Sequence, residues 1–364
     1  MLTPKNKRDF YRIIPFGIIW FTYGFIYLFL EKGLLYDLDF YPSTGNPYKF
    51  GSNTVVSLLV GAISGLLMGT LEIRVINNIF VNQSFGRKIL SKTLIYVLLM
   101  FTFVIVVSAI RYSVILGTSI FAQQIWENTW NFFSSVSFWT FQLYFAAMIG
   151  VSLFYSEVRD NIGMSVLHNF IIGKYHKPIQ EDRIFMFLDL KSSTTIAEKI
   201  GHVKYFEMLR EYYSDLSDPI IQYNGEVYQY VGDEIIVSWK LKNGIQENNC
   251  LKCFFAMKES LRDRSEKYKS KFEILPSFKA GFHYGKVTTG EIGVLKKDIV
   301  FSGDVLNTTA RIQGLCNKYN VDILISDQLK NKMNIESEFK IQSQGINELR
   351  GRKEVIELFT VQLK

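Results

Sequence analysis

Four long apolar runs in the first 154 residues limit what this chain can fold into more than any other feature. They cover Ile13–Leu30, Thr54–Leu71, Thr93–Ile110 and Phe132–Phe154, and each carries few or no charged residues. Runs of roughly 18 residues or more are long enough to cross a bilayer as a helix. Buried core helices are the alternative, but the length and the repetition favour membrane spans. We therefore expect a helical transmembrane domain of four helices over residues 1–154.

The basic residues between the runs predict the orientation of these helices. Cytoplasmic loops of membrane proteins are enriched in Lys and Arg. The segments before the first run and after the second are both basic, with Lys5, Lys7, Arg8, Arg12, Arg74, Arg87, Lys88 and Lys92. The other two loops hold only Lys32, Lys49 and Arg111. We expect a multi-pass protein of the cell (inner) membrane, in contact with membrane lipid, whose N-terminus and second half are cytoplasmic.

The first run is expected to be a retained helix and not a signal peptide, because it is too long and no small-residue cleavage site follows it. The runs contain almost no ionisable residues, which argues against an ion or proton pathway and so against a transporter or channel. Gly61, Gly65 and Gly69 recur every four residues. Such a stripe either packs against a neighbouring helix or faces lipid.

Charge and cysteine content exclude further classes. The net charge of +7 is explained by basic cytoplasmic loops, and no basic face interleaved with aromatic residues predicts a nucleic-acid partner. The three cysteines, Cys250, Cys253 and Cys316, form no disulfide framework and fit a reducing cytosol. Cys250 and Cys253 lie on a predicted amphipathic helix, where we expect them to be reduced and packed inward.

Residues 155–180 are expected to connect the two halves. Val158, Ile162, Val166 and Phe170 share one face of a helix-compatible segment, and Pro178 ends it. This connector either transmits motion, sets the geometry of a dimer, or is only a spacer.

Two acidic residues carry the strongest chemical signal in the second half. An apolar, strand-like run, Ile184–Leu188, ends at Asp189, and small hydroxyl residues follow it. Asp233 lies between two β-rich runs, at the predicted turn of a hairpin over Gly225–Trp239. Carboxylates on neighbouring strand ends can hold two divalent ions a few Å apart, an arrangement used for in-line attack at phosphorus.

The order of elements from residue 181 to 364 predicts an α+β domain. Strands and helices interleave around the central hairpin, with helical segments over Thr195–Tyr223 broken near Gly201, and another over Asn248–Arg264. This pattern fits a ferredoxin-like sheet with helices on one face.

Four separated segments of this half contain its most distinctive residues. They are FLDLKSSTTIAEKIG, GEVYQYVGDEIIVSW, FKAGFHYGKVTTGEIG and FSGDVLNTTARIQ. In this order, over Arg183–Lys364, they resemble the catalytic domain of class III nucleotidyl cyclases. Together with the four apolar runs, the resemblance implies a membrane-bound adenylate cyclase that converts ATP to 3′,5′-cyclic AMP and pyrophosphate for signal transduction.

The resemblance also implies roles for particular residues. Two divalent metal ions, Mg²⁺ or Mn²⁺, would be held by Asp189, Asp233 and the backbone carbonyl of Leu190. Asn307 would steady the ribose, and Arg311 the transition-state phosphate. In the family the metal ligands come from one subunit and the Asn/Arg pair from the other, which implies a head-to-tail homodimer.

The positions that read the base depart from the family patterns. Gln229 stands where adenylate cyclases have Lys, and Val300 where they have Asp or Thr. The Gln amide can donate and accept hydrogen bonds, whereas Val300 offers none. ATP is the expected substrate, and GTP, with cyclic GMP as the product, remains the alternative.

Several other residues have two possible roles. The backbone N–H groups of Ser192, Ser193 and Thr194 either bind phosphate or belong to a cap of a helix that begins at Thr195. Lys191 either approaches the triphosphate or is an exposed turn residue. Arg352 or Lys353 resembles a C-terminal residue that contacts phosphate in the family. His283, on the strand of GFHYG, is expected to be a packed core residue and not a base.

Two other functions would explain parts of this sequence. A diguanylate cyclase is suggested by Gly232-Asp233-Glu234, but Val231 replaces the preceding Gly and the Asn307/Arg311 pair belongs to the class III pattern. A non-catalytic nucleotide sensor on a membrane anchor would explain Gln229 and Val300. The retained Asp and Asn/Arg residues argue against it.

Overall fold

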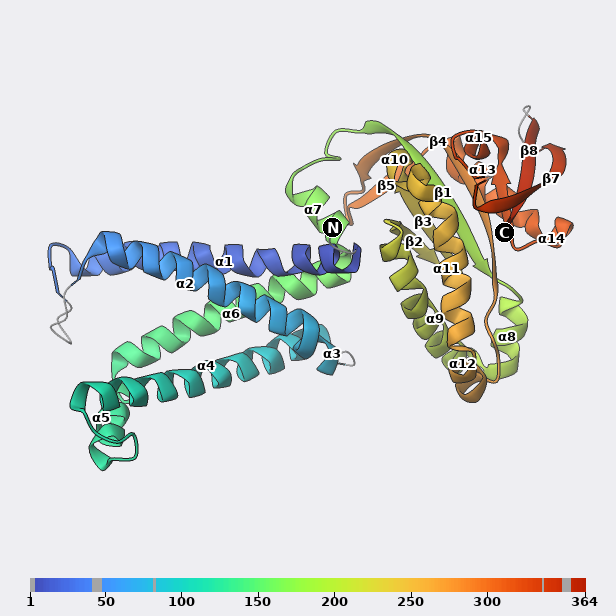
Figure 1. Ribbon diagram of the computed structural model, residues 1–364. Coiled ribbons are helices and arrows are strands. Elements are labelled where there is room, and N and C mark those ends of the chain that lie inside the picture. Colours follow the sequence, from blue (N-terminus) through green and yellow to red (C-terminus); the bar gives the residue numbers. More distant parts are fainter. Residues whose placement is uncertain (1–3, 41–47, 81–82, 336, 349–354) are drawn as a thin grey trace. The chain divides into compact units, whose positions relative to one another are not determined.

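The computed structural model describes residues 4–40, 48–80, 83–335, 337–348 and 355–364. The chain divides into two compact units (Figure 1). One comprises Asp9–Leu167 and the other His168–Lys364 together with Met1–Arg8.

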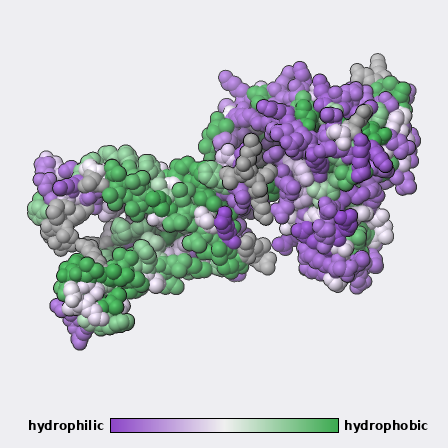
Figure 2. Space-filling model, in the orientation of Figure 1, coloured by the Kyte–Doolittle hydropathy of each residue, from purple (hydrophilic) through white to green (hydrophobic). Residues whose placement is uncertain are grey.

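The first unit is a bundle of long helices. These are α1 (Pro4–Leu35), α2 (Phe50–Leu71), α4 (Phe85–Leu116) and α6 (Val136–Ile162). Four candidate membrane spans lie on them, at Asn6–Leu35, Asn53–Ile76, Phe85–Leu116 and Phe138–Ile162. Large apolar side chains are exposed along these helices, and Figure 2 shows the resulting hydrophobic surface. The four predicted apolar helices are therefore confirmed.

The fourth helix begins and ends later than expected. Residues Gln123–Phe133 form a separate helix, α5, and α6 begins only at Val136 because Ser135 caps it by accepting a hydrogen bond from the Phe138 N–H (3.2 Å). The helix then continues past residue 154 to Ile162 and ends at Gly163, whose φ is +99°. The first residues of the predicted connector therefore belong to α6, and α7 (Met164–Ile171) follows.

The glycine stripe of α2 packs against α1. A Cβ atom on Gly65 would lie 2.6 Å from the Phe16 carbonyl oxygen, and one on Gly61 would lie 3.2 Å from that of Trp20. A Cβ atom on Gly69 would meet the Phe16 side chain at 3.0 Å. The stripe thus permits close backbone approach, so the packing role is the correct one of the two interpretations.

A fully buried lysine joins three helices of the bundle. The Lys92 ammonium on α4 donates to Glu72 Oε1 (2.6 Å) and to Glu157 Oε1 on α6 (2.8 Å), and Asn77 Oδ1 lies 3.0 Å away. Glu72 begins a short π-helix, η1 (Glu72–Ile76), that continues α2, and it also accepts from the Tyr96 hydroxyl (3.1 Å). These charged residues lie one to three positions outside the predicted runs, which is why the runs looked uncharged.

The second unit is built on one mixed sheet with strand order β2-β3-β1-β4-β6-β8-β7, and β5 pairs with β4. The strands are β1 (Ile179–Leu190), β2 (Glu226–Val231), β3 (Glu234–Lys240), β4 (Phe278–Ile292), β5 (Asp298–Ser302), β6 (Ile323–Ser326), β7 (Phe339–Glu348) and β8 (Val355–Leu363). The helical segments are α8 (Ser193–Ile200), α9 (His202–Gln222), α10 (Leu241–Ile245), η2 (Gln246–Asn248), α11 (Asn249–Asp263), α12 (Ser265–Phe272), α13 (Asp304–Gly314), α14 (Cys316–Tyr319) and α15 (Asp327–Lys330). The predicted α+β sheet and its central hairpin are confirmed.

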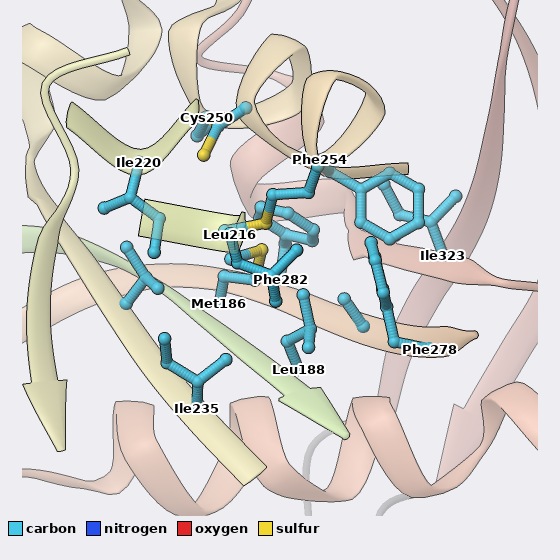
Figure 3. Close-up of a cluster of buried hydrophobic side chains, with 14 of the residues drawn as sticks. Met186, Leu188, Leu216, Ile220, Ile235, Cys250, Phe254, Phe278, Phe282 and Ile323 are labelled. Carbon is cyan, nitrogen blue, oxygen red and sulfur yellow. The ribbon is translucent and has the colours of Figure 1, made fainter. Parts of the chain in front are cut away.

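Helices cover both faces of this sheet, and not one face as expected. Met186 and Leu188 of β1 pack with α9 and α11 in the main core, which Figure 3 shows. Phe185 and Phe187, which alternate with them and so point to the other face, pack with Val305 of α13. Sequence periodicity did not reveal which face α13 would take.

The cysteines of α11 lie in the main core. Cys250 and Cys253 are free and fully buried, and burial raises the pKa of the Cys250 thiol to about 12. The prediction of reduced, inward-packed cysteines is confirmed.

We predict that Gly65→Ala destabilises the bundle, because the new methyl group would collide with the α1 backbone. Overpacking of this kind costs about 1–3 kcal/mol. Thermal unfolding of the full chain in detergent would measure it. Gly150→Ala on α6 is the matched control, because no heavy atom lies within 4 Å of its added Cβ atom. Equal melting temperatures for the two variants would contradict the close packing.

We also predict that Lys92→Met destabilises the bundle, because it leaves Glu72 and Glu157 as buried charges without their shared cation. Breaking a buried ion pair costs about 3–5 kcal/mol. Adding Glu72→Gln and Glu157→Gln to Lys92→Met should restore much of the loss in the same unfolding assay. A triple variant no more stable than Lys92→Met would contradict the charge-based explanation.

Candidate active site

The two predicted acids lie at the ends of adjacent strands. Asp189 is the penultimate residue of β1, and the strand register places it opposite Glu234, the first residue of β3. Asp233 therefore precedes the cross-strand partner of Asp189, in a turn that Gly232 makes possible with a φ of +63°. The predicted hairpin with an acid at its turn is confirmed.

Two side chains of other elements hold one oxygen of Asp189. Lys279 Nζ, directly across on β4, and Gln313 Nε2, on α13, each lie 3.2 Å from Asp189 Oδ2. Burial raises the pKa of Asp189, and the nearby charge of Asp233 adds to the rise, while the hydrogen bond from Lys279 opposes it. The other carboxylate oxygen, Oδ1, takes part in neither contact.

Sequence reasoning missed Lys279 and Gln313. A lysine between the apolar residues of FKAGF was a usable signal, because lysine is rarely placed in a buried strand without a partner. Gln313 had no such signal, because only the crossing of α13 over β4 brings it to Asp189. A Cβ atom on Gly281 would lie 2.3 Å from the Gln313 backbone nitrogen, so this crossing requires glycine.

A third carboxylate, Glu234, adjoins the pair. Burial, followed by the charges of Asp189 and Asp233, raises the pKa of Glu234 to about 7. Within the described ranges, no group of three or more His, Cys, Asp or Glu side chains is arranged to hold a metal ion. The two aspartates and the backbone carbonyl of Leu190 offer only oxygen donors, a set that suits Mg²⁺ or Mn²⁺.

The turn after β1 differs in detail from the expectation. Ser192 has a φ of +56°, and α8 begins at Ser193, two residues earlier than predicted. The predicted helix start at Thr195 is therefore wrong, and Ser192 is the residue before the helix, although its side chain makes no cap hydrogen bond. The first helical bond runs from the Ile196 N–H to the Ser192 carbonyl (2.9 Å), so the N–H groups of Ser193 and Thr194 have no acceptor within the helix.

Gln229 on β2 and Val300 on β5 are the two positions that the resemblance assigns to the base. Their chain neighbours, Tyr228 and Phe301, are in contact. The rings of Tyr228 and Phe301 lie 4.8 Å apart between centroids, and the Phe301 N–H donates to the Tyr228 hydroxyl oxygen (3.4 Å). The departure of both residues from the adenylate pattern therefore falls in one region.

Asn307 and Arg311 face away from the acids of their own chain. They lie one turn apart on α13, opposite the stripe formed by Val305, Thr309 and Ile312, which is buried against the sheet. Asn307 is exposed, and neither side chain forms a hydrogen bond or ion pair with another residue that the structure describes. Since Gln313 of the same helix contacts Asp189, the Asn/Arg pair is not brought to the Asp pair within one chain.

The remaining candidates are placed as follows. Lys191 forms an ion pair with Asp322, which Lys258 also contacts at 2.6 Å. His283 is buried, and its Nδ1 lies 2.8 Å from Ser326 Oγ, which confirms the core role. Arg352 and Lys353 lie outside the described residues.

Comparisons with known proteins point to one family. The sequence profile of the family described as the adenylate and guanylate cyclase catalytic domain matches residues 176–362. Adenylate cyclase 2 of Rhizobium meliloti (strain 1021) is 32% identical over 210 residues, which are 58% of this chain and 58% of that protein. The adenylate cyclase of Anabaena cylindrica is 25% identical over 184 residues, covering 48% of this chain and 36% of that protein.

The chain thus aligns with less than two thirds of the length of these curated relatives. Among solved structures, a bacterial light-regulated adenylyl cyclase shares the fold, with a TM-score of 0.52 and 19% identity. The alignment covers 63% of this chain and 64% of that one.

We predict that Lys279→Met increases the affinity of the acid pair for Mn²⁺. Removing one positive charge that lies 3.2 Å from Asp189 Oδ2 removes repulsion of about 1 kcal/mol, which is roughly a fivefold change in affinity. Electron paramagnetic resonance titration of the full chain with Mn²⁺ alone would measure it. Lys191→Met is the matched control, because this lysine pairs with Asp322 instead. Unchanged or weaker Mn²⁺ binding by Lys279→Met would contradict the prediction.

Proposed function

This chain belongs to the family of adenylate and guanylate cyclase catalytic domains, and from that membership we propose that it is a membrane-anchored enzyme that converts ATP to 3′,5′-cyclic AMP and pyrophosphate. The observation that carries the proposal is the placement of Asp189 and Asp233 on adjoining strand ends. This arrangement gathers two carboxylates at one edge of the sheet, within electrostatic reach of each other.

Asp189, Asp233 and the Leu190 carbonyl are the groups that would hold two divalent metal ions, Mg²⁺ or Mn²⁺. When bound, such ions lower the pKa of a coordinated hydroxyl group and offset phosphate charge. Lys279 and Gln313 keep the Asp189 carboxylate oriented through its Oδ2 atom. Lys279 also places a positive charge beside the proposed metal ligands.

The protein's own part in the reaction is positioning and charge stabilisation. The ribose 3′-hydroxyl releases its proton to solvent water and its oxygen attacks the α-phosphorus, so that a new P–O bond forms and the bond to the bridging oxygen of the β-phosphate breaks to release pyrophosphate. Asn307 would orient the ribose, and Arg311 would stabilise the charge that develops on the phosphate. The N–H groups of Ser193 and Thr194, which have no acceptor within α8, would bind phosphate oxygens, and Ser192 sets the turn before them.

We propose that a second copy of the chain completes each site. The direction of Asn307 and Arg311 supports this, because they point away from the acids of their own chain. A homodimer in which each copy presents this face of α13 to the other copy's acids would contain two equivalent sites.

The distribution of basic residues supports a cytoplasmic N-terminus and catalytic domain. The four candidate spans would anchor the enzyme in the lipid of the cell membrane and return the chain to its starting side.

ATP is proposed over GTP because the relatives named above are adenylate cyclases. Gln229 and Val300 keep the guanylate cyclase alternative open, and they also leave open a non-catalytic nucleotide sensor. The deciding experiment incubates the full chain in nanodiscs with Mn²⁺ or Mg²⁺ and either ATP or GTP, and identifies the cyclic product by mass spectrometry. Cyclic AMP is expected. Nucleotide binding without turnover would favour the sensor.

We predict that Asp189→Ala and Asp233→Ala each lower turnover by a factor of at least about 100, because each removes a ligand of the proposed metal pair. The same cyclic-nucleotide assay measures this loss. Asp322→Ala is a control, because this aspartate pairs with Lys191 and Lys258 and not with the two acids. Retained activity in either acid variant would exclude the two-metal mechanism.

We also predict partial complementation between two inactive variants. Asp189→Ala and Arg311→Ala chains, co-expressed, would form heterodimers with one intact composite site, and about half of the wild-type activity per heterodimer should return. Tandem affinity purification with two tags isolates the heterodimer for assay. Heterodimers without activity would contradict shared sites.

A further inference from the structure

A buried arginine of the sheet contacts the end of the connector. Arg183, on β1, is only 2% exposed, and its side chain points to the α13 face together with Phe185. Its guanidinium donates in several directions: Nε to Glu181 Oε2 (2.8 Å), Nη1 to Glu226 Oε2 (2.8 Å) and Ser238 Oγ (3.1 Å), and Nη2 to the Tyr175 hydroxyl oxygen (3.4 Å). None of these contacts belongs to the proposed chemistry.

On one side, this arginine contacts the segment that enters the domain. Tyr175 lies between α7 and β1 and is itself 2% exposed. Its hydroxyl donates to Glu181 Oε1 (3.0 Å), and its backbone carbonyl accepts from the Glu291 N–H of β4 (3.1 Å). Although burial raises the pKa of Glu181, hydrogen bonds from Arg183 and Lys174 lower it to about 2. The connector is therefore held by a charged network.

On the other side, the arginine contacts both strands that carry the base positions. Glu226, which accepts from Arg183, is three residues before Gln229 on β2. The guanidinium carbon lies 4.6 Å from the ring centre of Phe301, which directly follows Val300 on β5. Phe301 in turn contacts Tyr228, the residue before Gln229, through the ring pair and the hydrogen bond described above.

The choice of arginine fits this geometry. Five N–H donors on a rigid planar group allow one side chain to bind Glu181, Glu226 and Tyr175 in three directions at once and still lie over a ring. A lysine has a single ammonium and would lose part of this set. Apolar residues of similar size would fill the space without the cost of burying charge, so the charged network is better explained by the positions it sets than by stability.

We propose that Arg183 is a positioning residue that ties the connector at Tyr175 to the strands that carry Gln229 and Val300, so that the connector influences how the nucleotide base is held. The inference rests on the proposed function, because it assigns the base contact to these two positions. It adds a route by which the segment after the membrane helices acts on nucleotide affinity and base selectivity.

The test uses the full chain in nanodiscs and the mild variant Tyr175→Phe, which removes one hydroxyl group from the network. Tyr268→Phe is the matched control, because it removes a buried hydroxyl bonded to Asp215 (2.8 Å) within the helical layer of the same unit. The readouts are kcat and KM for ATP and for GTP, the dissociation constants of both Mn²⁺-nucleotides by calorimetry, and the melting temperature.

Tyr175→Phe is expected to change the ATP-to-GTP ratio of kcat/KM, or of the dissociation constants, by about threefold or more, as for one hydrogen bond lost from a coupled network. The change should lie in KM more than in kcat. Tyr268→Phe should keep the ratio within about twofold while losing similar stability. Arg183→Lys should act in the same direction as Tyr175→Phe, and Arg183→Met more strongly if it folds.

One result would overturn the inference. In it, Tyr175→Phe loses stability like the control, but its ATP-to-GTP ratios of kcat/KM and of the dissociation constants both stay within about twofold of wild type. That outcome differs from failure of the proposed function, in which the wild-type chain itself turns over neither nucleotide. If the wild-type chain binds nucleotide without turnover, the dissociation constants alone decide the inference. If it binds neither nucleotide, both proposals fall together.

Discussion

The pairing register of β1 with its two neighbours is the constraint on which the candidate site depends. In that register Asp189 lies opposite Glu234 on one side and opposite Lys279 on the other. A shift of one residue would turn Asp189 to the opposite face and move Phe185 and Phe187 out of their packing with α13. Because β1 is buried on both faces, a slip of one residue would bury the Asp189 carboxylate in the main core and misplace the apolar side chains that pack there, and this cost holds the acid in place.

Helix α13 depends on that register and keeps Asn307 and Arg311 away from Asp189 of the same chain. It crosses β4 at Gly281, where no side chain would fit, and this contact brings Gln313 to Asp189. Helical geometry then turns Asn307 and Arg311 to the outer face. The Gln313 contact thus orients Asp189. The same contact fixes α13 so that Asn307 and Arg311 of that chain point away from Asp189.

Buried charge recurs in both units. In the bundle, Lys92 joins Glu72 and Glu157, and in the catalytic unit Arg183 joins Glu181 and Glu226. Each network links segments far apart in sequence. The first includes α6, through Glu157, and the second includes the loop between α7 and β1, through Tyr175. Because breaking a buried ion pair leaves an unpaired buried charge, each network penalises arrangements that separate the segments it links.

The sequence by itself determined the four apolar helices, the α+β sheet, the hairpin turn at Asp233 and the strand that ends at Asp189. These follow from local patterns: run length, alternation, and a Gly-Asp turn between β-rich segments. Only the tertiary structure decided that α13 covers the second face of the sheet, that Lys279 and Gln313 hold Asp189, and that Lys92 and Arg183 become buried network centres. The reason is physical, because each of those contacts joins residues distant in the chain, and their energy depends on strand register and helix crossing, which no local pattern records.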